Sequence, residues 1–257
     1  MTVLIISCHP DDAEFMMAGT ALLLRRAGCS VHSINVANGC DGSTETGPVE
    51  TAAIRRKEAM KAAALLGSEF HESLVDDLEV FYVQDLIRRV TALVRQVKPD
   101  IVLTQSMEDY MEDHMNTARV AVTATFLRGV SNYRSTPDEA ATLNDVMLYH
   151  ATPLAVTDMM RRPITPEMYV DISSVIDEKE KMLACHASQK EWLDKTQGFD
   201  SYLKTMRDAA QLIGRMSGRF PYAEGWRRHS HVGYRRQDGN PIADLLKDRC
   251  VMGPGVR

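Results

Sequence analysis

An apolar run of strand type at residues 3–6 ends abruptly in His9-Pro10-Asp11-Asp12, and this junction constrains the fold strongly. Pro10 fixes its own φ and pushes the preceding residue towards extended geometry. We therefore expect His9 at the carboxyl end of a strand and both aspartates in the turn that opens the next helix. In open α/β sheets, ligands bind at that edge. The alternative interpretation is an N-cap aspartate beside a surface histidine.

Strand-like and helix-like segments alternate along the first part of the chain. The expected strands are residues 2–8, 31–37, 70–75 and 101–105, and the expected helices are residues 12–27, 51–66 and 83–97. The last of these helices carries apolar residues at helical spacing, and the strands are apolar almost throughout. This order predicts an α/β fold, Rossmann-like, with a mostly parallel sheet and helices on both faces.

The second half of the chain continues the pattern less regularly. We expect helices at residues 116–127, 175–195 and 199–216, strands at 146–150 and 168–172, a mobile flap at 158–167 and an irregular tail from residue 219. No repeat or linker divides the sequence. The prediction is one domain over residues 1–257, with 219–257 as a C-terminal extension that contributes to the active site or to oligomer contacts.

Composition narrows the class of protein. The formal net charge of −5 gives no general attraction to nucleic acid or to anionic lipid. Five cysteines, an odd number and never in a CxxC pair, are typical of reduced thiols. The N-terminus has no basic leader, and its apolar run is too short to span a bilayer. We expect a cytoplasmic protein without nucleic-acid or membrane partners.

A glycine-containing loop follows the second expected strand. Residues 38–44 are small and polar, so their backbone can approach a ligand closely. The loop fits neither GxGxxG nor the Walker pattern. This absence counts against a nucleotide-dependent Rossmann enzyme, which is a rival interpretation of the same fold.

His9 and Asp12 could share one cation, with Asp11 facing a bound water. A catalytic zinc site has three protein ligands and an open position for water. His114 is the candidate for the third ligand, because it also follows a buried strand and is the only histidine between His71 and His150. Its spacing from His9 does not by itself establish the site.

At this point the sequence resembles a family. His9-Pro10-Asp11-Asp12-Ala13-Glu14 resembles the HPDDxE signature of the LmbE-like (PIG-L) zinc-dependent de-N-acetylases. Three further blocks resemble this family in its order, across roughly the first 190 residues. They are Arg55-Arg56-Lys57-Glu58 with Leu66-Gly67, then Lys98-Pro99-Asp100 with Asp109-Tyr110 and Asp113-His114, and then Lys179, Leu183 and His186-Ala187-Ser188-Gln189.

The resemblance implies a role for each matching residue. His9, Asp12 and His114 would bind one divalent metal per subunit, Zn²⁺ or alternatively Fe²⁺, and Asp11 would be the catalytic general base. The substrate would be a small-molecule N-acetylated amino sugar or glycoconjugate of N-acetylglucosamine type. Family members are often oligomers, which implies a homo-oligomer.

Four residues are candidates for substrate binding: Arg55, His186, Gln189 and His231. Arg55 would hold a substrate oxygen; alternatively it is a solvated helix charge paired with Glu58 one turn on. His186 is alternatively a core histidine. Residues 222–231 mix aromatic and imidazole groups, which suits the apolar face of a sugar.

The chain departs from the family pattern at Met111, where the family's second loop carries a histidine credited with acid or oxyanion-stabilising work. A thioether can do neither. Three explanations stay open. Another group substitutes, with His186, His231, His150 and Glu112 as candidates; Asp11 shuttles the proton itself; or the protein is a catalytically weak or inactive metal- or sugar-binding relative.

Overall fold

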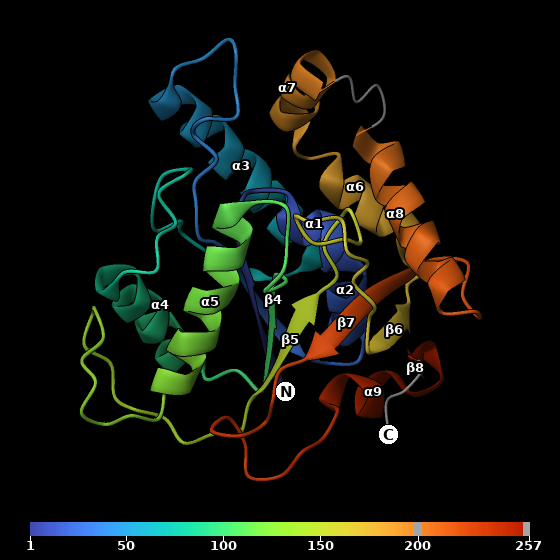
Figure 1. Cartoon of the computed structure of the whole chain (residues 1–257). Helices are drawn as coiled ribbons and strands as arrows, with labels where there is room; N and C mark the ends of the chain where they lie inside the picture. The colour runs from blue at the N-terminus through green and yellow to red at the C-terminus, as the bar shows by residue number, and fades with distance from the viewer. Residues whose placement is uncertain (198–201, 254–257) are drawn as a thin grey trace.

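A single mixed sheet of eight strands organises the computed structural model, which describes residues 1–197 and 202–253 (Figure 1). The strand order is β3-β2-β1-β4-β5-β7-β6-β8. The strands are β1 (Thr2–Ser7), β2 (Ser30–Asn35), β3 (Glu69–His71), β4 (Ile101–Thr104), β5 (Met147–Ala151), β6 (Met168–Asp171), β7 (Ala223–Arg228) and β8 (Cys250–Met252). The neighbours among β3, β2, β1, β4 and β5 pair in parallel. Strand β7 is antiparallel to both β5 and β6, and β8 is antiparallel to β6. The predicted fold class is confirmed.

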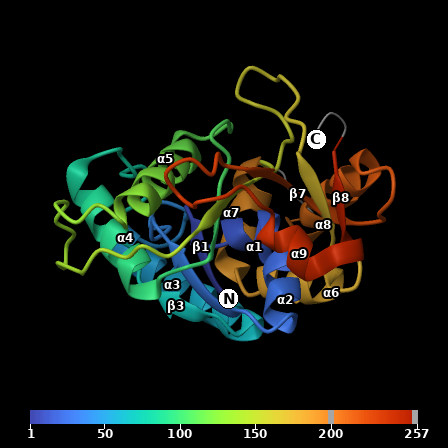
Figure 2. The same ribbon diagram turned by 90° about the horizontal axis from the view of Figure 1, so that it is seen from below.

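Helices cover both faces of this sheet (Figure 2). They are α1 (Asp12–Met16), α2 (Ala18–Arg26), α3 (Pro48–Leu66), α4 (Gln84–Val97), α5 (Glu112–Leu127), α6 (Ile176–Leu183), α7 (Ala187–Gln197), α8 (Tyr202–Met216) and α9 (Pro241–Leu246). Helices α4 and α5 pack with one face of the sheet, and α1, α2 and α6 pack with the other. A short 3₁₀ turn, Lys247–Arg249, joins α9 to β8.

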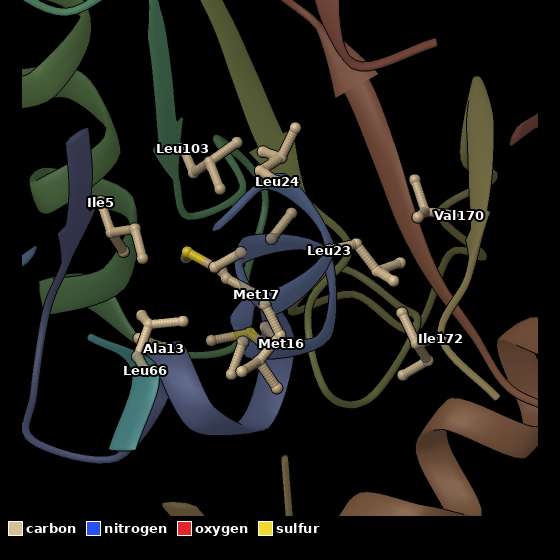
Figure 3. Packing of buried hydrophobic residues seen from close by; sticks show 14 of the residues in the cluster. Ile5, Ala13, Met16, Met17, Leu23, Leu24, Leu66, Leu103, Val170 and Ile172 are labelled. Carbon is tan, nitrogen blue, oxygen red and sulfur yellow. The ribbon is translucent and has the colours of Figure 1, made fainter. Parts of the chain in front are cut away.

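The alternation of side chains along β1 explains this layering. Val3 and Ile5 join the core beneath α1 and α2, whereas Leu4 and Ile6 join the core beneath α4. All four side chains have zero exposure, as expected for a parallel strand buried on both faces. In Figure 3, residues of α1 and α2 pack between Ile5 and the strand β6.

Two expected helices are each divided in the structure. Residues 12–27 form α1 and α2 with a break at Met17, and residues 175–195 form α6 and α7 with a break after Leu183. In each case a distant carboxylate accepts hydrogen bonds from the first turn of the second helix. Glu224 accepts from the backbone N–H of Gly19 and Thr20 at 2.8 and 2.7 Å, and Glu58 accepts from Ser188 N–H at 2.9 Å.

The prediction of an irregular tail from residue 219 was wrong. Strand β7 enters the sheet between β5 and β6, and α9 and β8 follow it. Trp226 on β7 has zero exposure and donates from Nε1 to Thr20 Oγ1 at 2.9 Å. The C-terminal residues therefore complete the sheet instead of extending from it.

Other differences are matters of boundaries. Helix α3 begins at Pro48, a favoured first helical residue, and α5 begins at Glu112, so His114 lies in a first helical turn. None of the helices in residues 1–197 and 202–253 is both long enough and apolar enough to cross a membrane.

Candidate active site

The conspicuous polar residues gather where β1 and β4 end. These strands are neighbours, and the chain leaves them for α1 and α5. On the other side of β1 lies β2, so the direction of the strand order changes at this point, which is where ligands bind in open α/β sheets. A cavity of about 810 Å³ opens here and includes His9, Asp11, Asp12 and His114 in its wall.

The structure brings His9, Asp12 and His114 together around one carboxylate oxygen. Asp12 Oδ2 lies 3.4 Å from His9 Nδ1 and 3.3 Å from His114 Nε2. The same oxygen accepts hydrogen bonds from His9 backbone N–H at 2.7 Å and from Gln105 Nε2 at 2.8 Å. These contacts fix the carboxylate between the two imidazole rings, and all three side chains are buried.

The second nitrogen of each imidazole lies near another carboxylate. His9 Nε2 is 3.3 Å from Asp113 Oδ2, and His114 Nδ1 is 3.2 Å from Asp109 Oδ1. Metal-binding histidines characteristically direct the nitrogen that does not bind the metal towards such a group, which fixes the tautomer and the ring orientation. The arrangement therefore leaves His9 Nδ1 and His114 Nε2 on the side of Asp12.

The electrostatics of this cluster favour a cation. Burial opposes ionisation of Asp12, but His114 and His9 outweigh it and lower the pKa of the carboxyl. Burial likewise opposes protonation of His114, yet Asp12 and Asp109 raise its pKa. Both shifts have the same physical cause, the attraction between the Asp12 carboxylate and the imidazole rings beside it.

This donor set fits a divalent transition metal. Two ligand atoms about 2.0–2.2 Å from a tetrahedral ion are separated by about 3.3–3.6 Å, which matches the two distances to Asp12 Oδ2. The Sγ atom of Cys8 lies within 4.8 Å of a ligand atom of His9 and of Asp12, but Cys8 fits this metal site less well. Its Sγ lies 3.6 Å from Nε2 of His9, the nitrogen away from Asp12, and burial raises its pKa to about 11.

Asp11 lies between the two ligand candidates in sequence and holds an unusual backbone conformation, with φ of 109°. Tyr202 Oη donates to Asp11 Oδ2 at 2.5 Å, and Arg55 Nη2 lies 3.6 Å from Asp11 Oδ1. Burial raises the pKa of the Asp11 carboxyl; Arg55 and Tyr202 counteract this, and Asp12 adds to it. A buried carboxylate in a strained turn, held from two sides, is typical of a functional group.

Arg55 is a buried residue of the site and not a solvated helix charge. Its guanidinium donates to Pro10 carbonyl oxygen at 2.5 Å and to Gly39 carbonyl oxygen at 3.3 Å. Gly39 has φ of +79°, and a Cβ there would lie 2.6 Å from the Arg55 side chain. The small residues of this loop thus make room for the arginine. The alternative pairing with Glu58 does not occur, because Glu58 binds Ser188.

The remaining substrate-binding candidates lie in different places. Gln189 lines the cavity. His186, three residues before Gln189, is buried, and its Nε2 lies 3.4 Å from Glu14 Oε2. His231 lies 3.9 Å from Asp238 and is not part of the described cavity wall. The aromatic platform expected at residues 222–231 is contradicted at Trp226, whose side chain is buried in the core.

Met111 lines the cavity, as the position of the family's loop histidine predicts. None of the four proposed substitutes lies in the described part of the cavity wall. His150 instead contacts Gln105 carbonyl oxygen at 2.8 Å and His229 at 3.1 Å. Glu112 is exposed on α5. The hydroxyl that contacts Asp11 is that of Tyr202, on α8.

Sequence reasoning missed Tyr202, Gln105 and the carboxylates Asp109 and Asp113 as parts of the site. Asp109 and Asp113 belong to a block already matched to the family, so their spacing around His114 was a usable signal. Gln105 follows the apolar strand β4 directly, and its polarity at a strand end was a second signal. Tyr202 carried none, because only the folding of α8 brings it to Asp11.

The rest of the cavity wall is mostly apolar. Apolar and aromatic side chains in the wall are Phe15, Met16, Leu78, Tyr110, Met111, Leu154, Ala155, Trp192, Leu193 and Tyr202. Arg55 is the only lysine or arginine among the described residues that line it. The wall thus combines polar and acidic groups with apolar and aromatic side chains.

Comparison with known proteins shows a family match over residues 4–125. Residues 4–125 match the model of the PIG-L family, described as GlcNAc-PI de-N-acetylase. These residues form a PIG-L (LmbE-like) family domain. The match contains His9, Asp11, Asp12, Arg55 and His114.

Individual relatives include two kinds of enzyme. The chain is 29% identical over 231 residues to diacetylchitobiose deacetylase of Thermococcus kodakarensis, covering 88% of this chain and 82% of that protein. It is 27% identical over 197 residues to 4-oxalmesaconate hydratase of Pseudomonas putida, covering 74% of each. The solved structure of N,N'-diacetylchitobiose deacetylase from Pyrococcus horikoshii superposes with a TM-score of 0.74 and 26% identity, covering 95% of this chain and 88% of that one.

Proposed function

We propose that this PIG-L protein is a metal-dependent de-N-acetylase acting on an N-acetylated amino sugar or glycoconjugate. The observation that carries the proposal is the buried Asp11 carboxylate beside the cluster of His9, Asp12 and His114 in one cavity wall. The family match and the two diacetylchitobiose deacetylases support the same reaction.

His9, Asp12 and His114 would hold one divalent ion, Zn²⁺ or Fe²⁺, which would supply the Lewis acidity that polarises an acetamide carbonyl and acidifies a water. Asp11 accepts the proton of the attacking water. Tyr202 already holds Asp11 Oδ2, so Oδ1 is the oxygen left for this transfer. Breaking the carbon–nitrogen bond then releases acetate and an amine.

The departing amine needs a proton, and Met111 cannot supply it. Asp11 holds the proton taken from water and returns it to the nitrogen, which is the shuttle that the sequence left open. The Tyr202 hydroxyl keeps the carboxylate in place through both transfers. This assignment is supported by the absence of the four substitute residues from the described cavity wall.

The cavity also favours a class of substrate. Its wall carries Phe15, Tyr110 and Leu154 beside the acidic groups, so an amino sugar with an apolar aglycone would bury more apolar area than the free sugar. Burying about 60 Å² more is worth about 1.5 kcal/mol, or roughly tenfold in kcat/KM. We expect an aryl glycoside of N-acetylglucosamine to exceed N-acetylglucosamine by that factor.

Hydration of an unsaturated carboxylic acid is the second candidate function, because one relative is 4-oxalmesaconate hydratase. A substrate with several carboxylates requires cationic partners. Among lysine and arginine side chains, the described cavity wall offers Arg55 alone, and this guanidinium already binds two backbone carbonyls. The charge of the wall therefore favours the deacetylase.

The deciding experiment measures acetate release from N,N'-diacetylchitobiose and from an aryl N-acetylglucosaminide. Zn²⁺-loaded wild type should release acetate, and Asp11→Asn should be slower by about 10²–10⁴-fold in kcat. Asp138→Asn, the same change on an exposed residue, should match wild type. Metal content and melting temperature of each variant report whether the site and the fold survive.

Equal release by wild type and Asp11→Asn would contradict the role of the base. No release by the metal-loaded wild type from either compound would favour the inactive relative. Consumption of 4-oxalmesaconate, followed by its absorbance, would favour the hydratase instead.

A further inference from the structure

A second group of metal-binding side chains lies at the edge of the sheet, outside the active site. The parallel register of β2 and β3 places His32 opposite Glu69 and Ile34 opposite His71. Glu69 and His71 are two residues apart on β3, so their side chains leave the same face. Pairing and alternation together bring His32, Glu69 and His71 onto one face.

The atoms of this group lie at distances suited to one ion. His32 Nδ1 is 3.1 Å from His71 Nε2 and 3.7 Å from Glu69 Oε2. These values bracket the separation of about 3.3–3.6 Å that a tetrahedral zinc site requires between two ligand atoms. The rings are stacked, with centroids 5.3 Å apart and planes inclined by 20°.

Solvent can reach the group. The side chains of His32 and Glu69 are 18% and 68% exposed, and β3 is the edge strand of the sheet. Burial and the neighbouring His32 lower the pKa of His71. Without a metal, the short contact between the rings is a hydrogen bond between imidazoles, which is the competing interpretation.

We propose that His32, Glu69 and His71 form a second binding site for a divalent transition metal such as Zn²⁺. Two imidazoles and a carboxylate are ligands suited to zinc, cobalt, nickel or copper and not to magnesium or calcium. The ion would join the edge strand β3 to β2. The site is independent of the proposed activity, because none of its residues lines the cavity.

The test is binding of Co²⁺ to the metal-free protein, with visible absorbance reporting tetrahedral coordination and equilibrium dialysis giving the stoichiometry. Wild type should bind about two equivalents, and His71→Asn and His114→Ala about one each. The double variant should bind almost none. His231→Asn, which alters a histidine of neither site, should match wild type.

Glu69→Gln provides a second measurement that does not depend on a buried residue. In the His114→Ala background, this exposed substitution should weaken Co²⁺ binding at least about tenfold. The proposal is overturned if His114→Ala binds no Co²⁺ when the Co²⁺ concentration is about 100 times that of the protein. That excess is roughly enough to fill even a weak surface site. Unchanged stoichiometry or affinity in both His71→Asn and Glu69→Gln would overturn it equally. Acetate release plays no part in either readout.

Discussion

Asp11 shows how distant partners fix the conformation of a single residue. A φ of 109° is costly for a residue with a side chain, and the conformation persists because Arg55 binds the preceding carbonyl and Tyr202 binds the carboxylate. The turn therefore depends on partners from α3 and α8. Residues far from the motif hold its central carboxylate in position.

The contact between Tyr202 and Asp11 yields a prediction about turnover. A hydrogen bond to a charged group contributes about 1.5–3 kcal/mol. Tyr202→Phe should therefore lower kcat by roughly 10–100-fold with little change in KM, because the bond positions the base and not the substrate. Steady-state kinetics on an aryl N-acetylglucosaminide measure both constants. A rise in KM at constant kcat would instead make Tyr202 a substrate contact.

His150 yields a prediction about stability and pH. Burial lowers its pKa from 6.5 to about 4, helped by His229 and Arg227 and opposed by the bond to Gln105 carbonyl oxygen. Between pH 6.5 and 4, His150 binds a proton in the unfolded chain but stays neutral in the folded chain. The free energy of unfolding should thus fall as pH falls through this window, by on the order of 3 kcal/mol from this residue.

Urea unfolding of wild type and His150→Gln at several pH values measures this contribution. The variant should lose part of the decrease between pH 6.5 and 4, whereas the control His231→Gln, at a half-buried histidine, should keep it. Parallel curves for wild type and His150→Gln would show that other groups cause the acid sensitivity.

At the scale of elements, two buried carboxylates decide where helices begin. Glu224 of β7 accepts from the first turn of α2, and Glu58 of α3 accepts from the first turn of α7. Helix propensity predicted continuous helices at both places. A long-range cap overrides that local preference, because it satisfies the backbone N–H groups that an interruption of the helix leaves without partners.

Lys179 completes the first of these caps, and its removal tests the cap. Lys179 Nζ donates to Glu224 Oε1 at 2.6 Å, and both side chains are at most 2% exposed. Lys179→Met leaves a buried carboxylate without its cation and should lower the free energy of unfolding by about 3–5 kcal/mol. Urea unfolding followed by circular dichroism gives the value.

Two companion variants sharpen this measurement. Adding Glu224→Gln to Lys179→Met removes the uncompensated charge and should recover part of the loss. Lys204→Met, which breaks an exposed pair with Asp208, should cost less than about 1 kcal/mol. Equal losses for the exposed and the buried lysine would refute the role of burial.

At the scale of the whole molecule, the C-terminal residues hold the two halves of the sheet together. Strand β7 pairs with β5 on one side and β6 on the other, and in Figure 1 it runs beside β5 in the opposite direction. Trp226 also packs edge-on against Tyr149 and reaches α2 through Thr20. The site is therefore built on a sheet that is complete only when the tail has folded.

Trp226 provides the prediction at this scale. Trp226→Ala should lower the free energy of unfolding by about 3–5 kcal/mol, because it leaves a large cavity in the core. Trp226→Phe, which keeps an aromatic ring and loses the bond to Thr20, should cost less. Chemical unfolding of the three proteins gives the comparison. A loss below about 1 kcal/mol for the alanine variant would contradict a structural role of the C-terminal residues in the sheet.

The sequence alone determined the fold class and the residues of the candidate metal cluster. Buried strands alternate with amphipathic helices, and this pattern is local. The HPDD turn and the block ending in Asp113-His114 each follow a strand, so the common edge of a parallel sheet brought His9, Asp12 and His114 together, as expected. Such residues are predictable because their neighbours in sequence carry the information.

Only the tertiary structure decided how Asp11, the proposed base, is held and where helices break. Tyr202 meets Asp11 across 191 residues, and Glu224 meets Gly19 across 205. The position of Trp226 was decided in the same way. The residues around it in the sequence suggested a surface for sugars, whereas strand pairing buries its side chain. Contacts of this kind have no local signature, because each depends on the free energy of packing the whole sheet and not on the residues beside it.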